Sequence, residues 1–161
     1  MPSIETAPIA DEDRAAVDAL SRRHWADTRV VYVQGAIDTR GLPGAVARID
    51  GAFAGAVTWL PEDGALRIVT IASALPGRGA GRALLAAVEA AAREDGLARV
   101  VVSTVNSNLH ALGFYQRNGY ALAALHRGAV AGLRRLKPAI PEVDANGIPI
   151  RDQIDLEKRL G

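Results

Sequence analysis

A glycine-rich segment, Pro76-Gly77-Arg78-Gly79-Ala80-Gly81-Arg82, lies between a stretch typical of a β-strand and one typical of an α-helix. The N-terminus of a helix exposes unpaired backbone N–H groups and a partial positive charge. Glycine lets the backbone approach an anion, because no Cβ stands in the way. The segment therefore predicts a cradle for a pyrophosphate, with Arg78 and Arg82 as additional cations. The alternative interpretation is a tight turn that binds nothing.

Three classes of phosphate ligand compete for this cradle. The segment lacks the GxxxxGK[ST] pattern, which disfavours a P-loop nucleotidase. It reads GxGxG rather than GxGxxG, and it follows an antiparallel meander rather than opening a first βαβ unit, which disfavours a Rossmann dinucleotide site. The pyrophosphate of coenzyme A remains as the expected ligand.

The hydrophobic pattern predicts strands in the first half of the chain. Asp50-Gly51 is a strong signal for a tight turn between strands 45–49 and 53–60. A second turn, Pro61-Glu62-Asp63-Gly64, leads into a strand over 66–73. Before this meander we expect a strand over 4–9, a helix capped by Asp11, and a strand or extended connector over 29–33.

Helices and strands alternate in the second half. The predicted elements, in order, are a helix around 84–92 that ends at Gly96, a buried strand over 99–104, a helix over 108–118 that ends at Gly119, a strand over 120–125, a short helix near Leu133, and a closing strand over 152–160. This order predicts an α/β (α+β) fold.

Composition narrows the functional classes. The chain has 161 residues, 49% of them hydrophobic, which fits one domain over 1–161. A net charge of +1 does not favour nucleic acid as a partner. Without cysteine, and with three histidines in no paired-ligand pattern, no metal site is expected. No apolar run reaches 18 residues and no signal peptide stands at the N-terminus, so we expect a cytoplasmic protein with no membrane partner.

A second motif follows, since residues 106–120 read NSNLHALGFYQRNGY. Together with GRGAGRALL at 77–85, this motif resembles the signatures of the GCN5-related N-acetyltransferase family, and the tail is similar to an uncharacterised bacterial subgroup. The resemblance covers 45–125 well. It implies a mixed central sheet of about six to seven strands flanked by helices. Its N-terminal half would be antiparallel, with a parallel, splayed pair over 66–73 and 99–104 at the cofactor cleft.

The resemblance also implies roles for particular residues, with acetyl-CoA as acyl donor. Backbone N–H groups from Gly77 to Arg82 would hold the pyrophosphate, and Asn108 would bind the cofactor arm. Tyr115 would protonate the departing thiolate. Pro76 departs from the family pattern, which usually has Gln or Arg there, so one backbone donor is missing. The strand end that would pair with the pantetheine amides consists of Ile71, Ala72 and Ser73.

The resemblance implies an N-acetyltransferase that acts on a primary amine, with a small molecule as the expected acceptor. A protein N-terminus or lysine is an alternative acceptor, a non-catalytic acyl-CoA sensor is an alternative function, and a homodimer is expected by analogy.

The general base stays open among His24, Asp38, Glu62, Asp63, His110, His126 and a water chain. Trp25 and His126 are candidates for the acceptor pocket, although core packing and a surface position are the plainer interpretations. Arg127, Arg134, Arg135 and Lys137 are read as a solvated helix face, or as cations for an acidic acceptor or the 3′-phosphate of coenzyme A.

Overall fold

The computed structural model describes residues 2–161. In chain order its elements are β1 Ile4–Pro8, the 3₁₀ helix η1 Asp11–Asp13, α1 Arg14–Trp25, β2 Arg29–Tyr32, β3 Gly35–Asp38, β4 Gly44–Ile49, β5 Ala52–Glu62, β6 Ala65–Ser73, α2 Ala80–Glu94, β7 Arg99–Val105, α3 Leu109–Arg117, β8 Ala121–His126, α4 Val130–Leu136 and β9 Gln153–Arg159. Seven strands form a mixed sheet in the order β1-β4-β5-β6-β7-β9-β8, which includes one parallel pair. The predicted mixed sheet is confirmed. The splay of strands 66–73 and 99–104 stays a prediction.

The chain comprises two compact units. The first unit holds residues up to 30 together with 38–100 and 159–161, and the second holds 31–37 and 101–158. The single domain over 1–161 stays a prediction.

Two tight turns build the antiparallel meander of the first unit. Asp50 and Gly51 have φ of 49° and 82°, and Asp63 and Gly64 have φ of 49° and 75°. Two consecutive residues with positive φ match the right-handed twist of the flanking strands. The turn predicted over four residues, 61–64, is therefore shorter than expected, because β5 continues to Glu62.

The first helix begins differently from the prediction. Asp11 does not cap it, because the N-cap of η1 is Ala10. The carboxylate of Asp13 accepts a hydrogen bond of 2.9 Å from the Ala10 N–H and pairs with the guanidinium of Arg48 on β4. The buried acidic group at this helix start is therefore Asp13, whose charge has a partner in the fold.

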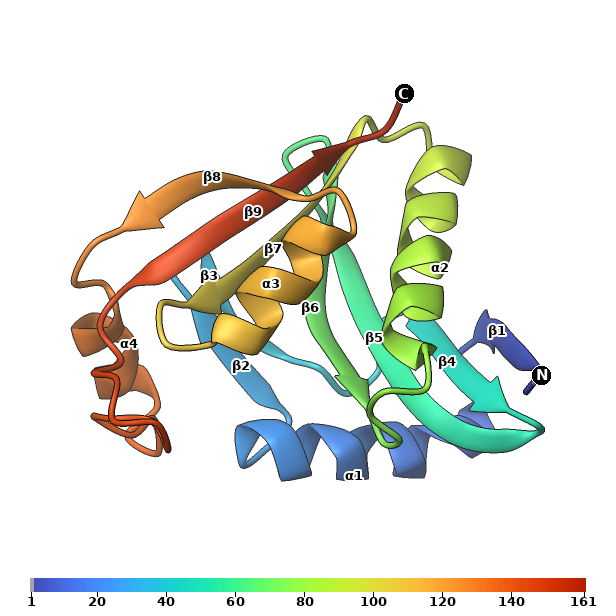
Figure 1. Cartoon of the computed structure of the whole chain (residues 1–161), viewed down its shortest axis with the longest axis horizontal. Helices are drawn as coiled ribbons and strands as arrows, with labels where there is room; N and C mark the ends of the chain where they lie inside the picture. The colour runs from blue at the N-terminus through green and yellow to red at the C-terminus, as the bar shows by residue number, and fades with distance from the viewer. Residues whose placement is uncertain (1) are drawn as a thin grey trace. The chain divides into compact units, whose positions relative to one another are not determined.

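Helices α1 and α2 cover opposite faces of β4, β5 and β6 (Figure 1). Ala56 belongs to the core cluster under α1, whereas a Cβ on the adjacent Gly55 would meet Leu84 of α2 at 3.3 Å. Alternation of side chains along a strand accounts for this division. Along α2, Leu84, Leu85 and Val88 are at most 1% exposed, so apolar side chains at helical spacing bury one stripe of the helix.

Hairpin β2–β3 was only half predicted. β2 lies at the predicted 29–33, but β3, over Gly35–Asp38, was missed. Its turn, Val33-Gln34, contains neither glycine nor a residue with positive φ, so it lacks the usual sequence signal.

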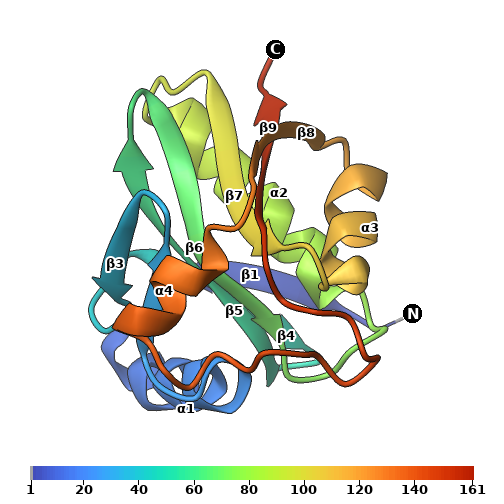
Figure 2. The same cartoon turned by 90° about the vertical axis from the view of Figure 1, so that its left-hand side faces the viewer.

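The second unit contains α3, α4, β8 and β9. β8 and β9 pair antiparallel, with His126 opposite Gln153. After α4 the chain follows a long loop back to β9 (Figure 2). The Arg134 side chain on α4 donates to the carbonyl oxygens of Ile140, Pro141 and Ile150 at 2.9 to 3.1 Å, which fixes this loop.

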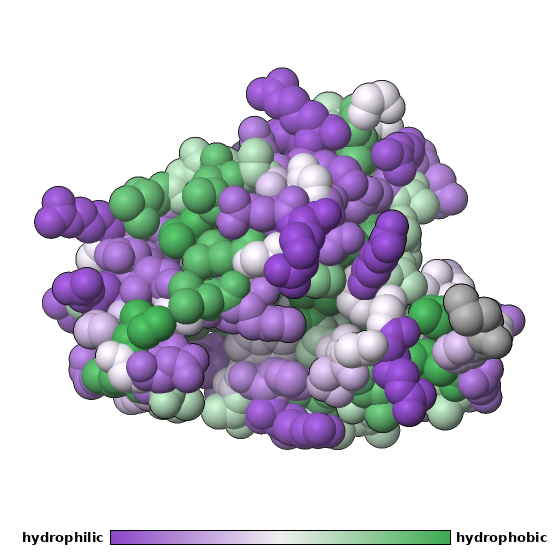
Figure 3. Space-filling view, in the orientation of Figure 1, coloured by the Kyte–Doolittle hydropathy of each residue, from purple (hydrophilic) through white to green (hydrophobic). Residues whose placement is uncertain are grey.

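β8 is an edge strand of the seven-stranded sheet and carries exposed apolar side chains. Leu122 and Leu125 are 58% and 63% exposed. Apolar groups gather over this strand in the space-filling view (Figure 3). In the part of the chain that the structure describes, no helix is long and apolar enough to cross a membrane.

Candidate functional site

The glycine loop between β6 and α2 presents free backbone donors. Gly79 is the N-cap of α2 with φ of 88°, and Gly77 has φ of 79°. The first backbone bond of the helix runs from Ala83 N–H to Gly79 O at 3.2 Å. The N–H groups from Gly79 to Arg82 therefore precede the helical ladder and have no helical partner. They lie at the positive end of a 15-residue helix.

Conformation explains why glycine is needed in this loop. A side chain on Gly77 would meet no atom within 4 Å, so its positive φ is the constraint. A Cβ on Gly79 would lie 3.2 Å from Ile4 Cδ1, which adds a close contact to the same backbone constraint. Arg78 and Arg82 are exposed. Both guanidinium groups are thus accessible to an anion at the loop.

The end of β6 lies beside a register shift. β5 and β6 pair Thr58 with Thr70 and Trp59 with Ile68, which leaves Val69 as an extra residue in β6. Such bulges bend a strand and re-aim its groups next to functional sites. The predicted pantetheine-binding residues Ile71, Ala72 and Ser73 follow this bulge and pair with β5. Their contact with a cofactor stays a prediction.

Asn108 begins α3 in the second unit. Its side-chain oxygen accepts a hydrogen bond of 3.1 Å from Ala111 N–H, so Asn108 is an N-cap residue. This structural role was not predicted. The side chain is exposed, so its NH₂ group is accessible to a cofactor, and the predicted cofactor contact remains untested.

Tyr115 lies on α3 with its ring enclosed. The residue is 5% exposed, and its ring centroid lies 5.4 Å from that of Phe114 and 5.8 Å from that of Tyr120. Burial raises the pKa of the phenol above its ordinary value. Within residues 2–161, no residue hydrogen-bonds the Tyr115 hydroxyl. Every fully buried side-chain nitrogen or oxygen in this range has a hydrogen-bond partner, so the Tyr115 hydroxyl is not fully buried and reaches the surface.

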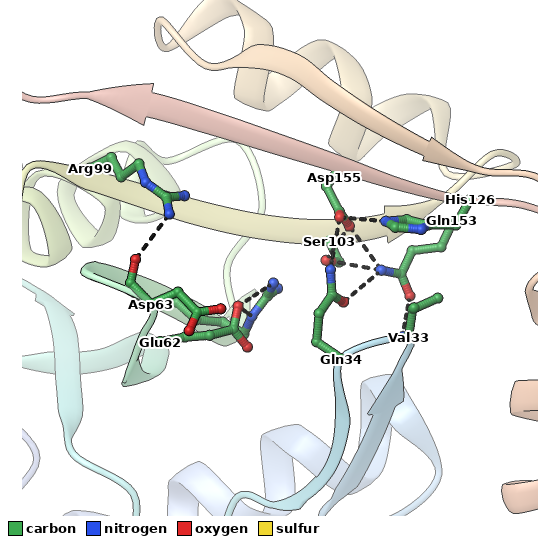
Figure 4. Close-up of polar contacts among 10 residues, drawn as sticks. Val33, Gln34, Glu62, Asp63, Arg99, Ser103, His126, Gln153 and Asp155 are labelled. Carbon is green, nitrogen blue, oxygen red and sulfur yellow. Dashed lines mark hydrogen bonds and ion pairs between the residues drawn. The ribbon is translucent and has the colours of Figure 1, made fainter.

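His126 belongs to a polar cluster that sequence reasoning missed. Its Nε2 lies 2.6 Å from Oδ2 of Asp155 on β9. The same carboxylate accepts hydrogen bonds from Ser103, Gln153 and Gln34 at 2.6, 2.8 and 2.9 Å (Figure 4). The available signal was that Gln153 and Asp155 are polar residues two apart in the closing strand, and therefore share one face. His126 is partly exposed, as the expected surface position implies, but its ring is also held in this cluster.

Two other candidate bases are held in ion pairs of the first unit. Asp38 pairs with Arg40 at 2.6 Å, and the guanidinium holds the pKa of that carboxyl below its ordinary value. Glu62 pairs at 2.7 Å with Arg67, which is 3% exposed. The carboxylates of Asp38 and Glu62 are therefore each paired with an arginine side chain.

The remaining candidates lie at the surface. His24 is exposed at the end of α1, and desolvation together with the charge of Arg23 lowers its pKa. Asp63 occupies a turn with its carbonyl oxygen 3.1 Å from an Arg99 nitrogen (Figure 4). His110 is exposed on α3. Within residues 2–161, no three histidine, aspartate or glutamate side chains gather as a metal site requires.

Trp25 stands at the end of α1 and is only partly buried. It packs against the core cluster of the first unit, and its ring centroid lies 5.6 Å from that of His24. Core packing thus accounts for this side chain, and a contact with the acceptor stays a prediction. The cluster consists of Val17, Leu20, Val46, Ala56 and Ala72.

The basic group around α4 only partly forms a solvated face. Arg127 and Arg135 are exposed, but Lys137 is 8% exposed, and Arg134 holds the following loop as described above. A cavity of about 450 Å³ lies between α4 and this loop. Its lining residues are Gly128, Ala131, Arg134, Glu142, Val143, Pro149, Ile150 and Arg151.

The chain is similar to known proteins in sequence and in structure. The model of the Acetyltransferase (GNAT) family matches residues 8–120. The uncharacterized protein YxbD of Bacillus subtilis (strain 168) is 35% identical over 154 residues, which are 95% of this chain and 97% of that protein. The structure of an IAA acetyltransferase from Bacillus cereus ATCC 14579 is 25% identical with a TM-score of 0.70, over 98% of this chain and 100% of that one. A Bacillus subtilis acetyltransferase in complex with CoA is 19% identical with a TM-score of 0.69, over 100% of both chains.

Proposed function

The chain belongs to the Acetyltransferase (GNAT) family, and from that premise we propose that it transfers the acetyl group of acetyl-CoA to the primary amine of a small molecule. The observation that carries this proposal is the row of free N–H groups at the start of α2. A pyrophosphate suits this place because it brings negative charge to a helix N-terminus. The CoA in the Bacillus subtilis structure supports the same ligand for a protein of this fold.

The residues of the cradle fit the pyrophosphate of coenzyme A. Gly77 and Gly79 hold the backbone in conformations that leave no Cβ at the donors, and Arg78 and Arg82 are free to add positive charge. Acetyl-CoA supplies the activated acyl group when it binds. At the end of β6, a backbone N–H near Ile71 is the proposed donor for the oxyanion that develops during attack.

Tyr115 is the proposed acid for the leaving thiolate. Its raised pKa keeps the phenol protonated at neutral pH, and its hydroxyl reaches the surface. Such a group gives its proton to a thiolate as the C–S bond breaks, and regains one from solvent afterwards.

Calorimetric titration of acetyl-CoA and free coenzyme A into the protein tests the cradle. We expect micromolar binding. Gly79→Glu puts a carboxylate at the donors and should weaken both affinities by roughly a hundredfold, about 2.7 kcal/mol. The matched control is Gly96→Glu, because Gly96 also has positive φ but follows the opposite end of α2. Absence of binding to the parent protein, or equal loss in both variants, would refute the cradle.

Thiol release in the presence of amines tests the transfer. Lysine, spermidine and kanamycin represent small-molecule acceptors, and peptides with a free N-terminus or an internal lysine represent proteins. Faster thiol release with a small amine supports the proposal, whereas release with peptides alone would favour a protein acetyltransferase. Binding of acetyl-CoA without turnover of any amine would favour an acyl-CoA sensor.

A further inference from the structure

Five side chains of the second unit form one hydrogen-bonded group, which we call the Asp155 cluster. Its members are Gln34, Ser103, His126, Gln153 and Asp155 (Figure 4). Strand register brings two of them together. Ala124 lies opposite Asp155 and His126 lies opposite Gln153, so His126 and Asp155 are diagonal neighbours across the β8–β9 pair.

The surroundings keep Asp155 ionised. Burial raises the pKa of its carboxyl, but hydrogen bonds from Ser103, His126, Gln153 and Gln34 outweigh burial and hold the pKa below its ordinary value. Gln153 also anchors the cluster, because its side-chain oxygen accepts a hydrogen bond of 2.8 Å from Val33 N–H. The carboxylate is thus a fixed negative charge near neutral pH.

An ionised carboxylate only accepts hydrogen bonds, which determines the tautomer of His126. Its Nε2 must carry the proton, since this nitrogen contacts Asp155. The lone pair of the neutral ring then lies on Nδ1. In the described chain no residue hydrogen-bonds Nδ1 of His126. Every fully buried side-chain nitrogen there has a hydrogen-bond partner, so Nδ1 is not fully buried and reaches the surface. His126 therefore presents an accessible proton acceptor.

Asp155 is the charged member of the cluster beside the His126 ring. Ser103, Gln153 and Gln34 are neutral, and across residues 2–161 no lysine or arginine pairs with Asp155. Of the charged residues nearby in sequence, Arg127 is exposed and Asp152 accepts a hydrogen bond from Gly128 N–H. Asp155 thus holds the ring from the Nε2 side and leaves Nδ1 open, as a carboxylate orients a catalytic histidine.

We propose that His126 is the general base that deprotonates the acceptor amine, and that Asp155 is the positioning residue that sets its tautomer and orientation. This inference rests on the proposed acetyl transfer. The acceptor arrives as R–NH₃⁺ and gives one proton to Nδ1. The neutral nitrogen forms a bond to the thioester carbonyl carbon, and the C–S bond breaks with its electron pair on sulfur. Tyr115 protonates the sulfur and regains a proton from solvent. The second proton from nitrogen and the proton on His126 pass to solvent, so the net products are the amide, the free thiol and one proton.

The pH profile of kcat/KM for the best amine of the acceptor screen tests this role. His126→Gln should lower kcat/KM by roughly 10² to 10⁴ and abolish the acid limb of the profile, because no imidazole remains to be neutralised. Asp155→Asn should lower kcat, because the ring loses the acceptor that fixes its Nε2–H tautomer. His110→Gln is the matched control for the loss of a histidine, and should keep the parent profile.

Nuclear magnetic resonance of the imidazole nitrogens in the whole parent protein tests the tautomer without any acceptor. We expect the Nε2–H form for His126 at pH 8, with Nδ1 unprotonated. An Nδ1–H tautomer, a His126→Gln profile with its acid limb intact, or a kcat that Asp155→Asn leaves at the parent value would each overturn the proposal. Loss of acetyl-CoA binding in the parent would instead refute the proposed transfer, so the two failures are distinct.

Discussion

Replacement of Tyr115 by phenylalanine separates the proposed acid from its packing role. Phenylalanine keeps the ring between Phe114 and Tyr120 and removes only the hydroxyl. General acid catalysis typically contributes a factor of about 10² to 10⁴ in rate, so kcat should fall by that factor. The fall corresponds to a loss of about 2.7 to 5.5 kcal/mol in transition-state stabilisation. The dissociation constant for acetyl-CoA should stay within about twofold, because a contact that matters only in the transition state does not change ground-state binding.

The structure also predicts that this variant stays folded. No residue in the described chain hydrogen-bonds the Tyr115 hydroxyl, so the substitution avoids the usual loss of about 0.5 to 1.5 kcal/mol per hydrogen bond. The free energy of unfolding should therefore change by less than about 1 kcal/mol. Tyr120→Phe is the matched control, since Tyr120 is a buried tyrosine in the same aromatic group and has no proposed part in the chemistry.

The assay combines steady-state thiol release with calorimetric titration and urea unfolding of the three proteins. The expected result is a fall in kcat for Tyr115→Phe alone, with similar affinity in all three proteins and a stability of Tyr115→Phe close to that of the parent. Turnover within about threefold of the parent would remove Tyr115 from the mechanism. An equal fall in Tyr120→Phe would show that the aromatic packing, rather than the hydroxyl, supports turnover.

Two further predictions concern stability. Because burial raises the pKa of Tyr115 in the folded state, the free energy of unfolding should decline as pH rises above about 10, by up to about 1.4 kcal/mol per pH unit. Unfolding in urea at pH 8 to 11 checks this prediction. It would be contradicted if the stability of the parent depended on pH no more strongly than that of Tyr115→Phe. Gly44→Ala should destabilise the first unit by about 3 kcal/mol, because the added Cβ would lie 2.0 Å from the Val57 carbonyl oxygen. Gly35→Ala meets nothing within 4 Å and is the control, so similar melting temperatures for both variants would refute the argument.

Local backbone chemistry explains the parts of the fold that were predicted from sequence. Asp50-Gly51 turns the first hairpin, and Gly96 and Gly119 have positive φ just after α2 and α3, as expected for helix ends. These signals involve residues adjacent in sequence, so no tertiary contact is needed to read them. Where the local signal is absent, as at Val33-Gln34, the prediction missed a strand.

Contacts between distant residues explain the errors. Three acidic residues precede α1, but only Asp13 meets Arg48, which lies 35 residues later, so the buried one could not be identified from sequence. Lys137 was grouped with a solvated helix face or with cations for a ligand, yet it is only 8% exposed.

The candidate site also has features that local sequence predicts and features that depend on contacts between distant residues. The sequence by itself predicted the glycine loop and the helix start at Gly77 to Arg82, because glycine conformation and a helix start are local properties. Its binding of a pyrophosphate stays a prediction. It also determined the family, through motifs that are contiguous in the chain. Only the tertiary structure joined His126 to Asp155, 29 residues apart, and added Ser103 and Gln34 to the same carboxylate. Hydrogen bonds require atoms within about 3 Å of each other, and the pairing of strands, rather than any local pattern, creates that proximity.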